Sequence, residues 1–581
     1  MFKSKFIAVV ILIGILILGC STKPIKQFTN PILAGFYPDP SLCRVGEDYY
    51  LVTSTFSYFP GIPIFHSKDL VNWELIGHVL DRPEQLDTEG LGISRGIFAP
   101  AITYSNGTFY VSCTVVDGGG NFIVTSAKPE GPYSDPIWLP EINGIDPSVY
   151  FDDNGKTYIL YNSDAPDNKP EYNGHRTIRM LELEPTSLKA KGEEKILING
   201  GSDFSKKPVW IEGPHFYKRF GYYYLMAAEG GTAEDHSEVI FRSKDINGPF
   251  EPYKNNPILT QRNLEPNRQN PITSTGHAAL VETPSGEWWA VFLGCRPYKP
   301  FEEGNYNLGR ETFLAPVRWI KEENSDDSIW PIINPDYEEV QFYYDYPNID
   351  IKGKVETTPY SGNFSLKYEF DKPELNKNFI FLRTPKEKWY NLNEKENYLT
   401  INLRPETCSG KLNPSFIGYR QQHNTCTATT SVIFDPITQN EKAGLVVIMN
   451  ESHFYFICKS IEYGNPVVQL YMGSDSTLDT STMKLIASSK INENDSKKEL
   501  QLRMNADGKD YSFQYSFDNT NWITLKDKVD GTYLKCDIPR DFVGCIIAMY
   551  ASSNGESSQN KAFYNWFEYA GNDEIYNIKR K

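Results

Sequence analysis

Asp39-Pro40-Ser41-Leu42 leads through a turn at Gly46-Glu47-Asp48 into the aromatic run Tyr49-Tyr50-Leu51-Val52, and this unit recurs in altered form along the first half of the chain. Each copy begins with a small or acidic residue next to Pro or His and continues through an apolar stretch, a turn and an aromatic strand. The other four copies begin at Ala99-Pro100, Asp146-Pro147, Gly213-Pro214 and Gly276-His277. Turns rich in Gly and Asn-Gly connect the strands of β-hairpins, so we predict one hairpin per copy.

The spacing of the copies predicts how the hairpins are arranged. The Pro or His residues, at positions 40, 100, 147, 214 and 277, lie 60, 47, 67 and 63 residues apart. Each interval accommodates about four short strands, and radially repeated four-stranded sheets form a β-propeller. We therefore predict five blades, with the first residues of each copy at the central axis. The alternative, five unrelated hairpins in a sandwich, does not explain the shared opening.

The repeat ends near residue 340, and a second kind of pattern follows. Short runs such as Gly444-Leu445-Val446-Val447-Ile448 and Phe454-Tyr455-Phe456-Ile457 are typical of strands in a β-sandwich. We predict an all-β chain with a propeller at 21–345, a linker rich in Pro, Asp, Gly and Ser at 346–365, and a sandwich domain at 366–575.

The N-terminus is typical of an export signal. Lys3 and Lys5 precede an apolar run from Phe6 to Leu18, and Ile17-Leu18-Gly19-Cys20 resembles a bacterial lipobox. We predict a lipoprotein signal peptide at 1–20 and lipidation of Cys20, which would attach the protein to a membrane of the cell envelope. A plain signal peptide or an uncleaved anchor is the alternative. Ser21-Thr22-Lys23-Pro24 lacks an acidic run, which favours the periplasmic face over the cell surface.

Charge and cysteine content exclude two other classes. The formal net charge of −16 repels phosphate backbones, so nucleic acid is not expected as a partner. The chain has nine cysteines but no C-x-x-C pair, which argues against a structural zinc site. Apart from Cys20, most cysteines lie in apolar strand patterns, where a buried free thiol is the common state. Disulfide pairing stays open, since an exported protein meets oxidising conditions.

Three acidic residues occur at the openings of the repeat. Asp39 opens the first copy, Asp146 opens the third, and Glu212 precedes the fourth opening by one residue. Ala99 and Gly276 stand at the other two, so an acid is no structural need of the repeat. Three carboxyl groups that meet on one axis cannot all ionise easily, and one pKa should rise. A protonated acid beside an ionised base is the pair that cleaves glycosidic bonds.

Several motifs in the order of the chain resemble glycoside hydrolase family 43, in its β-xylosidase and α-L-arabinofuranosidase branch. The resemblance covers about residues 30–340 as a five-bladed propeller, and the remainder is similar to the concanavalin-A-like jelly roll of that branch. The segments that carry it are Phe36-Tyr37-Pro38-Asp39-Pro40-Ser41, Ser54-Thr55-Phe56, Phe59-Pro60-Gly61, His66-Ser67-Lys68-Asp69-Leu70, Gly144-Ile145-Asp146-Pro147-Ser148, Ile211-Glu212-Gly213-Pro214-His215, Ala228-Glu229-Gly230-Gly231-Thr232, Gly276-His277-Ala278 and Gly309-Arg310-Glu311-Thr312.

The resemblance implies a role for each acid. Asp39 would be the general base that deprotonates a water, and Glu212 would be the general acid that protonates the leaving oxygen. Asp146 would adjust the pKa of the acid and orient it. The family inverts configuration, requires no cofactor, and forms no glycosyl-enzyme intermediate.

The resemblance also implies substrate contacts at Arg310, Phe56, Phe98, Ile145, His277 and Phe542. Arg310 would donate forked hydrogen bonds to sugar hydroxyls and keep a carboxylate ionised. His277 would either support a central water or Ca²⁺ ion indirectly, with no firm metal ligand, or be a purely structural histidine. Phe542 would close the pocket from the sandwich domain. Phe98 and Ile145 stand where β-xylosidases of this branch often have Trp and Phe, which leaves room for arabinofuranose.

We therefore predict an exo-acting, inverting β-1,4-xylosidase acting on xylo-oligosaccharides, with or without α-L-arabinofuranosidase activity. An α-L-arabinofuranosidase acting on xylan or arabinan side chains is the first alternative. A non-catalytic carbohydrate-binding lipoprotein is the alternative from another class, but it predicts the loss of at least one acid. A levan or sucrose enzyme on a related propeller predicts nucleophile motifs that this sequence lacks.

Overall fold

The computed structural model of the chain describes residues 27–299, 301, 305–322, 328–349, 357–474, 483–536 and 541–577; Cys20 lies outside these ranges. The regular structure in them is β-strand, apart from short 3₁₀ turns, which confirms the predicted all-β class. These turns are η1 (Pro166–Asn168), η2 (Phe204–Lys206), η3 (Gly531–Leu534) and η4 (Glu574–Tyr576). Within the same ranges, none of the helical segments is long and apolar enough to cross a bilayer.

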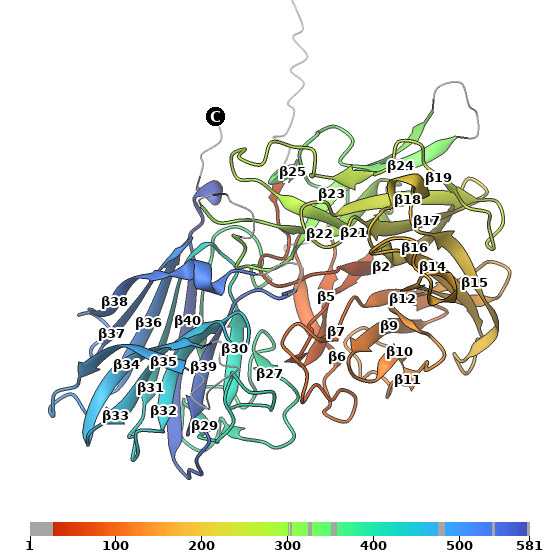
Figure 1. Cartoon of the computed structure of the whole chain (residues 1–581). Helices are drawn as coiled ribbons and strands as arrows, with labels where there is room; N and C mark the ends of the chain where they lie inside the picture. The colour runs from red at the N-terminus through yellow and green to blue at the C-terminus, as the bar shows by residue number, and fades with distance from the viewer. Residues whose placement is uncertain are drawn as a thin grey trace, which may run out of the picture.

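Five antiparallel sheets form a β-propeller, as predicted (Figure 1). Blades 1 and 2 contain β2 (Ser41–Val45), β3 (Asp48–Val52), β5 (Gly61–Ser67) and β6 (Glu74–Leu80), and then β7 (Gly96–Ile97), β8 (Ala101–Ser105), β9 (Thr108–Val116), β10 (Gly120–Ser126) and β11 (Ile137–Trp138). Blade 3 contains β12 (Gly144–Phe151), β13 (Thr157–Asp164), β14 (Arg176–Leu183) and β15 (Ala190–Asn199). Blades 4 and 5 contain β16 (Glu212–Arg219), β17 (Tyr222–Glu229), β18 (Ser237–Ser243), β19 (Glu251–Pro252) and β20 (Leu259–Thr260), and then β21 (Thr273–Glu282), β22 (Trp288–Cys295), β23 (Glu311–Lys321) and β24 (Ile329–Ile333).

All five predicted hairpins are present as the first antiparallel pair of a blade. They are β2–β3, β8–β9, β12–β13, β16–β17 and β21–β22. β1 (Gln27–Thr29) pairs with β25 (Tyr343–Asp345), so the start of the described chain lies beside the segment that leaves the propeller. The aromatic and β-branched residues of the hairpins fill the cores between blades, as their strand preference suggests.

Two eight-stranded antiparallel sheets form the sandwich, on the left in Figure 1. One contains β26 (Ser365–Glu369), β28 (Tyr390–Asn391), β29 (Leu399–Asn402), β31 (Thr425–Ile433), β36 (Leu500–Asp507), β37 (Asp510–Ser516), β38 (Ile523–Asp530) and β40 (Lys561–Gly571). The other contains β4 (Tyr58–Phe59), β27 (Ile380–Leu382), β30 (Phe416–Arg420), β32 (Lys442–Ile448), β33 (Phe454–Glu462), β34 (Asn465–Gly473), β35 (Met483–Lys490) and β39 (Ile546–Ser552).

The two domains are joined more closely than the sequence suggested. β4 belongs by sequence to blade 1 but pairs with β27, so it extends a sheet of the sandwich. The described part of the predicted linker is packed as well, because Tyr360 is buried and its carbonyl accepts the Ala34 N–H at 2.8 Å. The limits 21–345, 346–365 and 366–575 stay predictions. The eight cysteines in the described ranges are free thiols, seven of them buried, as the strand patterns indicated.

Candidate active site

A pocket of about 410 Å³ lies at the axis of the propeller and brings together all nine predicted active-site residues. These are Asp39, Asp146, Glu212, Phe56, Phe98, Ile145, His277, Arg310 and Phe542. Eight come from the propeller, and Phe542 comes from the sandwich domain. The pocket is therefore completed across the domain interface.

β-Bulges place the polar residues at the axis. In β12 the pairing register shifts between Ile145 and Ser148, and equivalent shifts occur in β16 between Glu212 and His215 and in β21 between Gly276 and Ala279. A bulge adds one residue to one strand and re-aims the neighbouring side chains. The sequence repeat thus encodes a backbone irregularity as well as a hairpin.

The bulges align the copies differently from the sequence. Asp39, Asp146, Gly213 and His277 all have left-handed backbones, with φ of 53°, 55°, 58° and 52°. His277 therefore occupies the position of the two aspartates, whereas the sequence alignment placed it with the prolines. The prediction was off by one residue because the fifth copy has Ala278 where the other four copies have Pro. A left-handed non-glycine residue is strained, and such strain clusters at functional sites.

Asp39 is held between a cation and a hydroxyl. Its two oxygens accept hydrogen bonds from the Arg310 guanidinium at 2.9 and 3.5 Å. Ser54 Oγ donates to Asp39 Oδ2 at 2.5 Å. Both side chains therefore donate hydrogen bonds to this buried carboxyl group.

Burial perturbs the other two carboxyl groups. Asp146 is 5% exposed and Glu212 is 7% exposed. Burial, assisted by the charge of Asp39, raises the pKa of Asp146 to about 6, although His277, the Gly213 N–H and Arg310 oppose the rise. Burial and then the charges of Asp146 and Asp39 raise the pKa of Glu212 well above its ordinary value. The site therefore favours the protonated form of Glu212 over a wider pH range than water does.

His277 lies against the backbone between these carboxyls. A Cβ on Gly213 would come within 2.8 Å of His277 Nε2, so only glycine fits there. Two side chains support the bulge at His277. Glu238, in β18, accepts the Ala278 N–H at 2.9 Å. His236, directly before β18, has its Nδ1 3.0 Å from the Ser274 carbonyl oxygen. No group of three or more His, Cys, Asp or Glu in the described ranges could hold a metal ion. A Ca²⁺ ion near His277 stays a prediction, and no step below involves one.

Aromatic rings form one wall of the pocket. Phe56 stacks on Phe542 with ring centroids 5.8 Å apart, and Phe98 meets Phe56 edge-on at 5.2 Å. The Arg310 guanidinium carbon lies 5.3 Å from the Phe542 centroid and 5.8 Å from that of Phe56. Phe542 is fixed by its N–H, which donates to Ser94 Oγ at 3.0 Å. The wall combines apolar faces with a cation, a combination suited to a sugar ring with its hydroxyls.

Several lining residues were not predicted from the sequence as catalytic or substrate-binding residues. They are Arg95, Ala99, Asn173, Gly174, Val209, Trp210, Gly231 and Thr232. Trp210 had a usable signal, since in an extended chain it shares a side with Glu212, two residues later. Asn173 and Gly174 lie between strands of blade 3 outside any repeat motif, so the sequence gave no reason to choose them.

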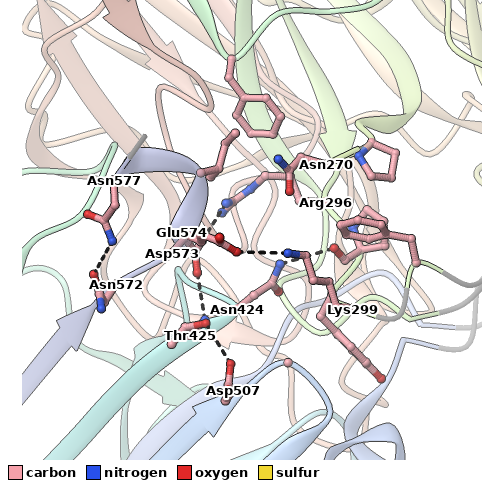
Figure 2. Close-up of a pocket in the computed structure, with 17 residues that line it drawn as sticks. Asn270, Arg296, Lys299, Asn424, Thr425, Asp507, Asn572, Asp573, Glu574 and Asn577 are labelled. Atoms are coloured by element: carbon pink, nitrogen blue, oxygen red, sulfur yellow. Dashed lines mark hydrogen bonds and ion pairs between the residues drawn. The ribbon is translucent and has the colours of Figure 1, made fainter. Parts of the chain in front are cut away.

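A second pocket of about 410 Å³ lies between the domains and contains none of the predicted residues (Figure 2). Four of its five charged lining residues form ion pairs. Arg296 binds Glu311 through Nε at 2.6 Å and Asp573 through Nη1 at 2.9 Å. Lys299 and Glu574 form an ion pair of 3.1 Å, drawn as a dashed line in Figure 2. We interpret these contacts as a structural connection between the propeller and the sandwich.

The propeller and the axial carboxyl groups define a glycoside-cleaving acid–base enzyme. The model of Glycosyl hydrolases family 43 matches residues 28–324, and the Beta xylosidase C-terminal Concanavalin A-like domain matches residues 367–570. The chain belongs to glycoside hydrolase family 43, and the second match confirms the predicted concanavalin-A-like fold of the sandwich. Glycosidases of this family need no cofactor.

Named relatives cover nearly the whole chain. A xylosidase/arabinosidase of Butyrivibrio fibrisolvens is 38% identical over 93% of this chain and 98% of its own length. A non-reducing end α-L-arabinofuranosidase of Bacteroides ovatus is also 38% identical, over 98% and 99%. Among solved structures, a xylan β-1,4-xylosidase from Bacillus halodurans superposes with a TM-score of 0.82 at 29% identity, over 94% of this chain and all of that one (100%).

Proposed function

We propose that the protein is an exo-acting, inverting glycosidase that releases xylose from the non-reducing ends of xylo-oligosaccharides. The observation that carries this proposal is the charge arrangement of the axial pocket: an Asp39 carboxylate paired with Arg310, in the same pocket as a Glu212 carboxyl whose pKa is raised. Acid–base glycosidases need one ionised and one protonated carboxyl group on opposite sides of the bond.

In the proposed reaction, the oxygen of a water molecule attacks the anomeric carbon, and Asp39 accepts a proton from that water. Glu212 gives its proton to the glycosidic oxygen as the bond to the leaving sugar breaks. The base gains one proton and the acid loses one, and exchange with solvent restores both. Since water attacks directly from the face opposite the leaving group, a single displacement inverts the anomeric configuration.

Asp146 supports the acid in this scheme. Its Oδ2 accepts the N–H of Gly213, the residue after Glu212, at 3.2 Å. Its charge is the second cause, after burial, of the raised pKa of Glu212. Asp146 therefore both fixes the backbone next to the acid and helps to raise the pKa of the acid.

Release of arabinose is the second candidate function. Phe98 and Ile145 line the pocket where the resembling β-xylosidases often have Trp and Phe, so this wall differs in shape. One relative of 38% identity is named a non-reducing end α-L-arabinofuranosidase, and another is named a xylosidase/arabinosidase. Both candidates use the same carboxyl groups and differ in how the pocket fits the sugar.

We also propose that the protein is a lipoprotein of the cell envelope. The support is the sequence: a basic start, an apolar run and Ile17-Leu18-Gly19-Cys20. Mass spectrometry of the mature N-terminus is the test. A diacylglyceryl group on Cys20 as first residue is expected, and an unmodified residue beyond Cys20 would contradict it.

The activity is tested with protein lacking residues 1–20 on an aryl β-xyloside and an aryl α-L-arabinofuranoside, beside a Glu212→Ala control. Release from the xyloside that is lost in Glu212→Ala supports the β-xylosidase and the acid together. Release mainly from the arabinofuranoside makes the second candidate the activity. Release from neither substrate by folded protein contradicts the pentosidase proposal.

A further inference from the structure

Trp210 occupies a special place at the edge of the axial pocket. It lines the pocket, lies two residues before Glu212, and has a left-handed backbone with φ of 57°. A bulky residue in this conformation is a genuine outlier and persists only where its surroundings enforce it. The enforcing contact on the backbone is the Trp210 N–H, which donates to the Gly174 carbonyl at 2.8 Å.

Arg176 fixes the indole ring from the other side. The guanidinium carbon of Arg176 lies 4.6 Å from the ring centroid of Trp210, within the range of a cation–π contact. Arg176 is itself immobilised, since its Nη2 and Nε donate to Asn162 Oδ1 at 2.7 and 3.1 Å and its Nη1 pairs with Asp164.

Asn162 also contacts the backbone next to the general acid. Asn162, which accepts from Arg176, donates through Nδ2 to the carbonyl of Ile211, the residue between Trp210 and Glu212. The Trp210 side chain lines the same pocket as the Glu212 carboxyl and lowers the pKa of that carboxyl. Asn162 thus fixes the backbone of the residue before Glu212, and Arg176 fixes the indole that shares the pocket with the Glu212 carboxyl.

We propose that Trp210 is a positioning residue for the general acid, and that its indole, stacked on Arg176, orients the Glu212 carboxyl toward the leaving oxygen. This inference rests on the proposed role of Glu212. It extends that role, because neither the repeat nor the family motifs assign a function to Trp210 or Arg176.

Leaving-group dependence tests the inference. Trp210→Phe keeps an aromatic ring on Arg176 but removes the indole N–H. A phenyl pentoside needs protonation of its leaving oxygen, whereas a 2,4-dinitrophenyl pentoside does not. We expect kcat/KM to fall about tenfold or more for the phenyl substrate and less than about twofold for the dinitrophenyl substrate. Equal losses on both substrates, or no loss on either, would overturn the proposal.

Two further variants make the result specific. Arg176→Met removes the cation behind the ring and should give the same leaving-group pattern, while equal losses on both substrates in folded protein would count against the proposal. Trp522→Phe is the matched control, because Trp522 carries an arginine stack in the sandwich domain, with the Arg503 guanidinium carbon 3.5 Å from its centroid. It should change neither rate, and a leaving-group effect there would overturn the assignment to Trp210.

The pH profile gives an independent readout. Burial and the charges of Asp146 and Asp39 raise the pKa of Glu212, whereas Arg310 and the Trp210 side chain lower it. Trp210→Phe should therefore raise the pKa of the acid and move the alkaline limb of kcat/KM to higher pH. An unmoved limb would contradict the contact. Glu212→Ala separates the two claims: if it shows no leaving-group dependence, the acid assignment itself is wrong.

Discussion

The axial pocket and the interdomain pocket each enclose about 410 Å³, yet they differ in how their charged side chains are paired. Between the domains, buried Arg296 is matched by Glu311 and by Asp573, and the second of these carboxylates is labelled in Figure 2. On the axis, the Asp39 carboxylate pairs with Arg310, and the pKa values of two further buried carboxyl groups, Asp146 and Glu212, rise. Ion pairs between opposite charges connect the two domains. Buried like charges without such partners lower stability, and they also give neighbouring carboxyl groups different pKa values, so that one can act as acid and another as base.

The largest effect is expected from the base on the axis. Asp39→Ala removes the group that takes the proton from water, and kcat/KM for an aryl pentoside should fall about 10³-fold. Steady-state kinetics of the purified variant measure this. Asp336→Ala, which removes an exposed partner of Arg318, is the control and should leave the rate unchanged. Retention of more than a tenth of the activity by Asp39→Ala would exclude it as the base.

Removing the Arg296 ion pairs of the interdomain pocket should lower the free energy of unfolding and not the rate of hydrolysis. Arg296→Met leaves the buried carboxylates of Glu311 and Asp573 without their cation, and loss of one partner of a buried ion pair costs about 3–5 kcal/mol. Denaturant unfolding monitored by tryptophan fluorescence measures the loss. An unchanged midpoint would show that the network does not connect the domains energetically.

On the axis, removing a charge should stabilise the fold. Burial raises the pKa of Glu212, so the folded state holds its proton more tightly than the unfolded chain. That contribution is fully present below the unfolded pKa of about 4.3 and is lost as pH rises through the folded pKa. Glu212→Gln should therefore match the wild type near pH 4 and exceed it by about 0.5–2 kcal/mol at pH 8. Thermal unfolding at both pH values checks this, and a gain that is larger at pH 4 would contradict the sign.

The smallest effect is expected at the aromatic wall. Phe542→Ala removes the ring that stacks on Phe56 and lies beside Arg310, while all the carboxyl groups remain. An aromatic contact of about 0.5–1.5 kcal/mol predicts a KM raised about three- to tenfold with kcat nearly constant. Michaelis kinetics separate the two constants. A fall in kcat alone would indicate that the sandwich domain acts on the chemistry and not on binding.

The sequence predicted more of the site than of the connections between domains. Asp39, Asp146 and His277 could be located because they stand at repeated positions, and a propeller brings such positions to one axis. The one-residue error at His277 arose because a bulge alters pairing without leaving a distinct residue pattern. β4, the Arg296 network and Asn173 depend on contacts between segments far apart in the chain, which no local periodicity encodes.

The stereochemistry of the first-formed product tests the central claim most directly. The active aryl pentoside is hydrolysed in an NMR tube, and the anomeric proton of the released sugar is followed before mutarotation. A base that activates water opposite a protonated acid predicts a product of inverted anomeric configuration. A first-formed product with the configuration of the substrate would require a covalent intermediate and would contradict the roles proposed for Asp39 and Glu212.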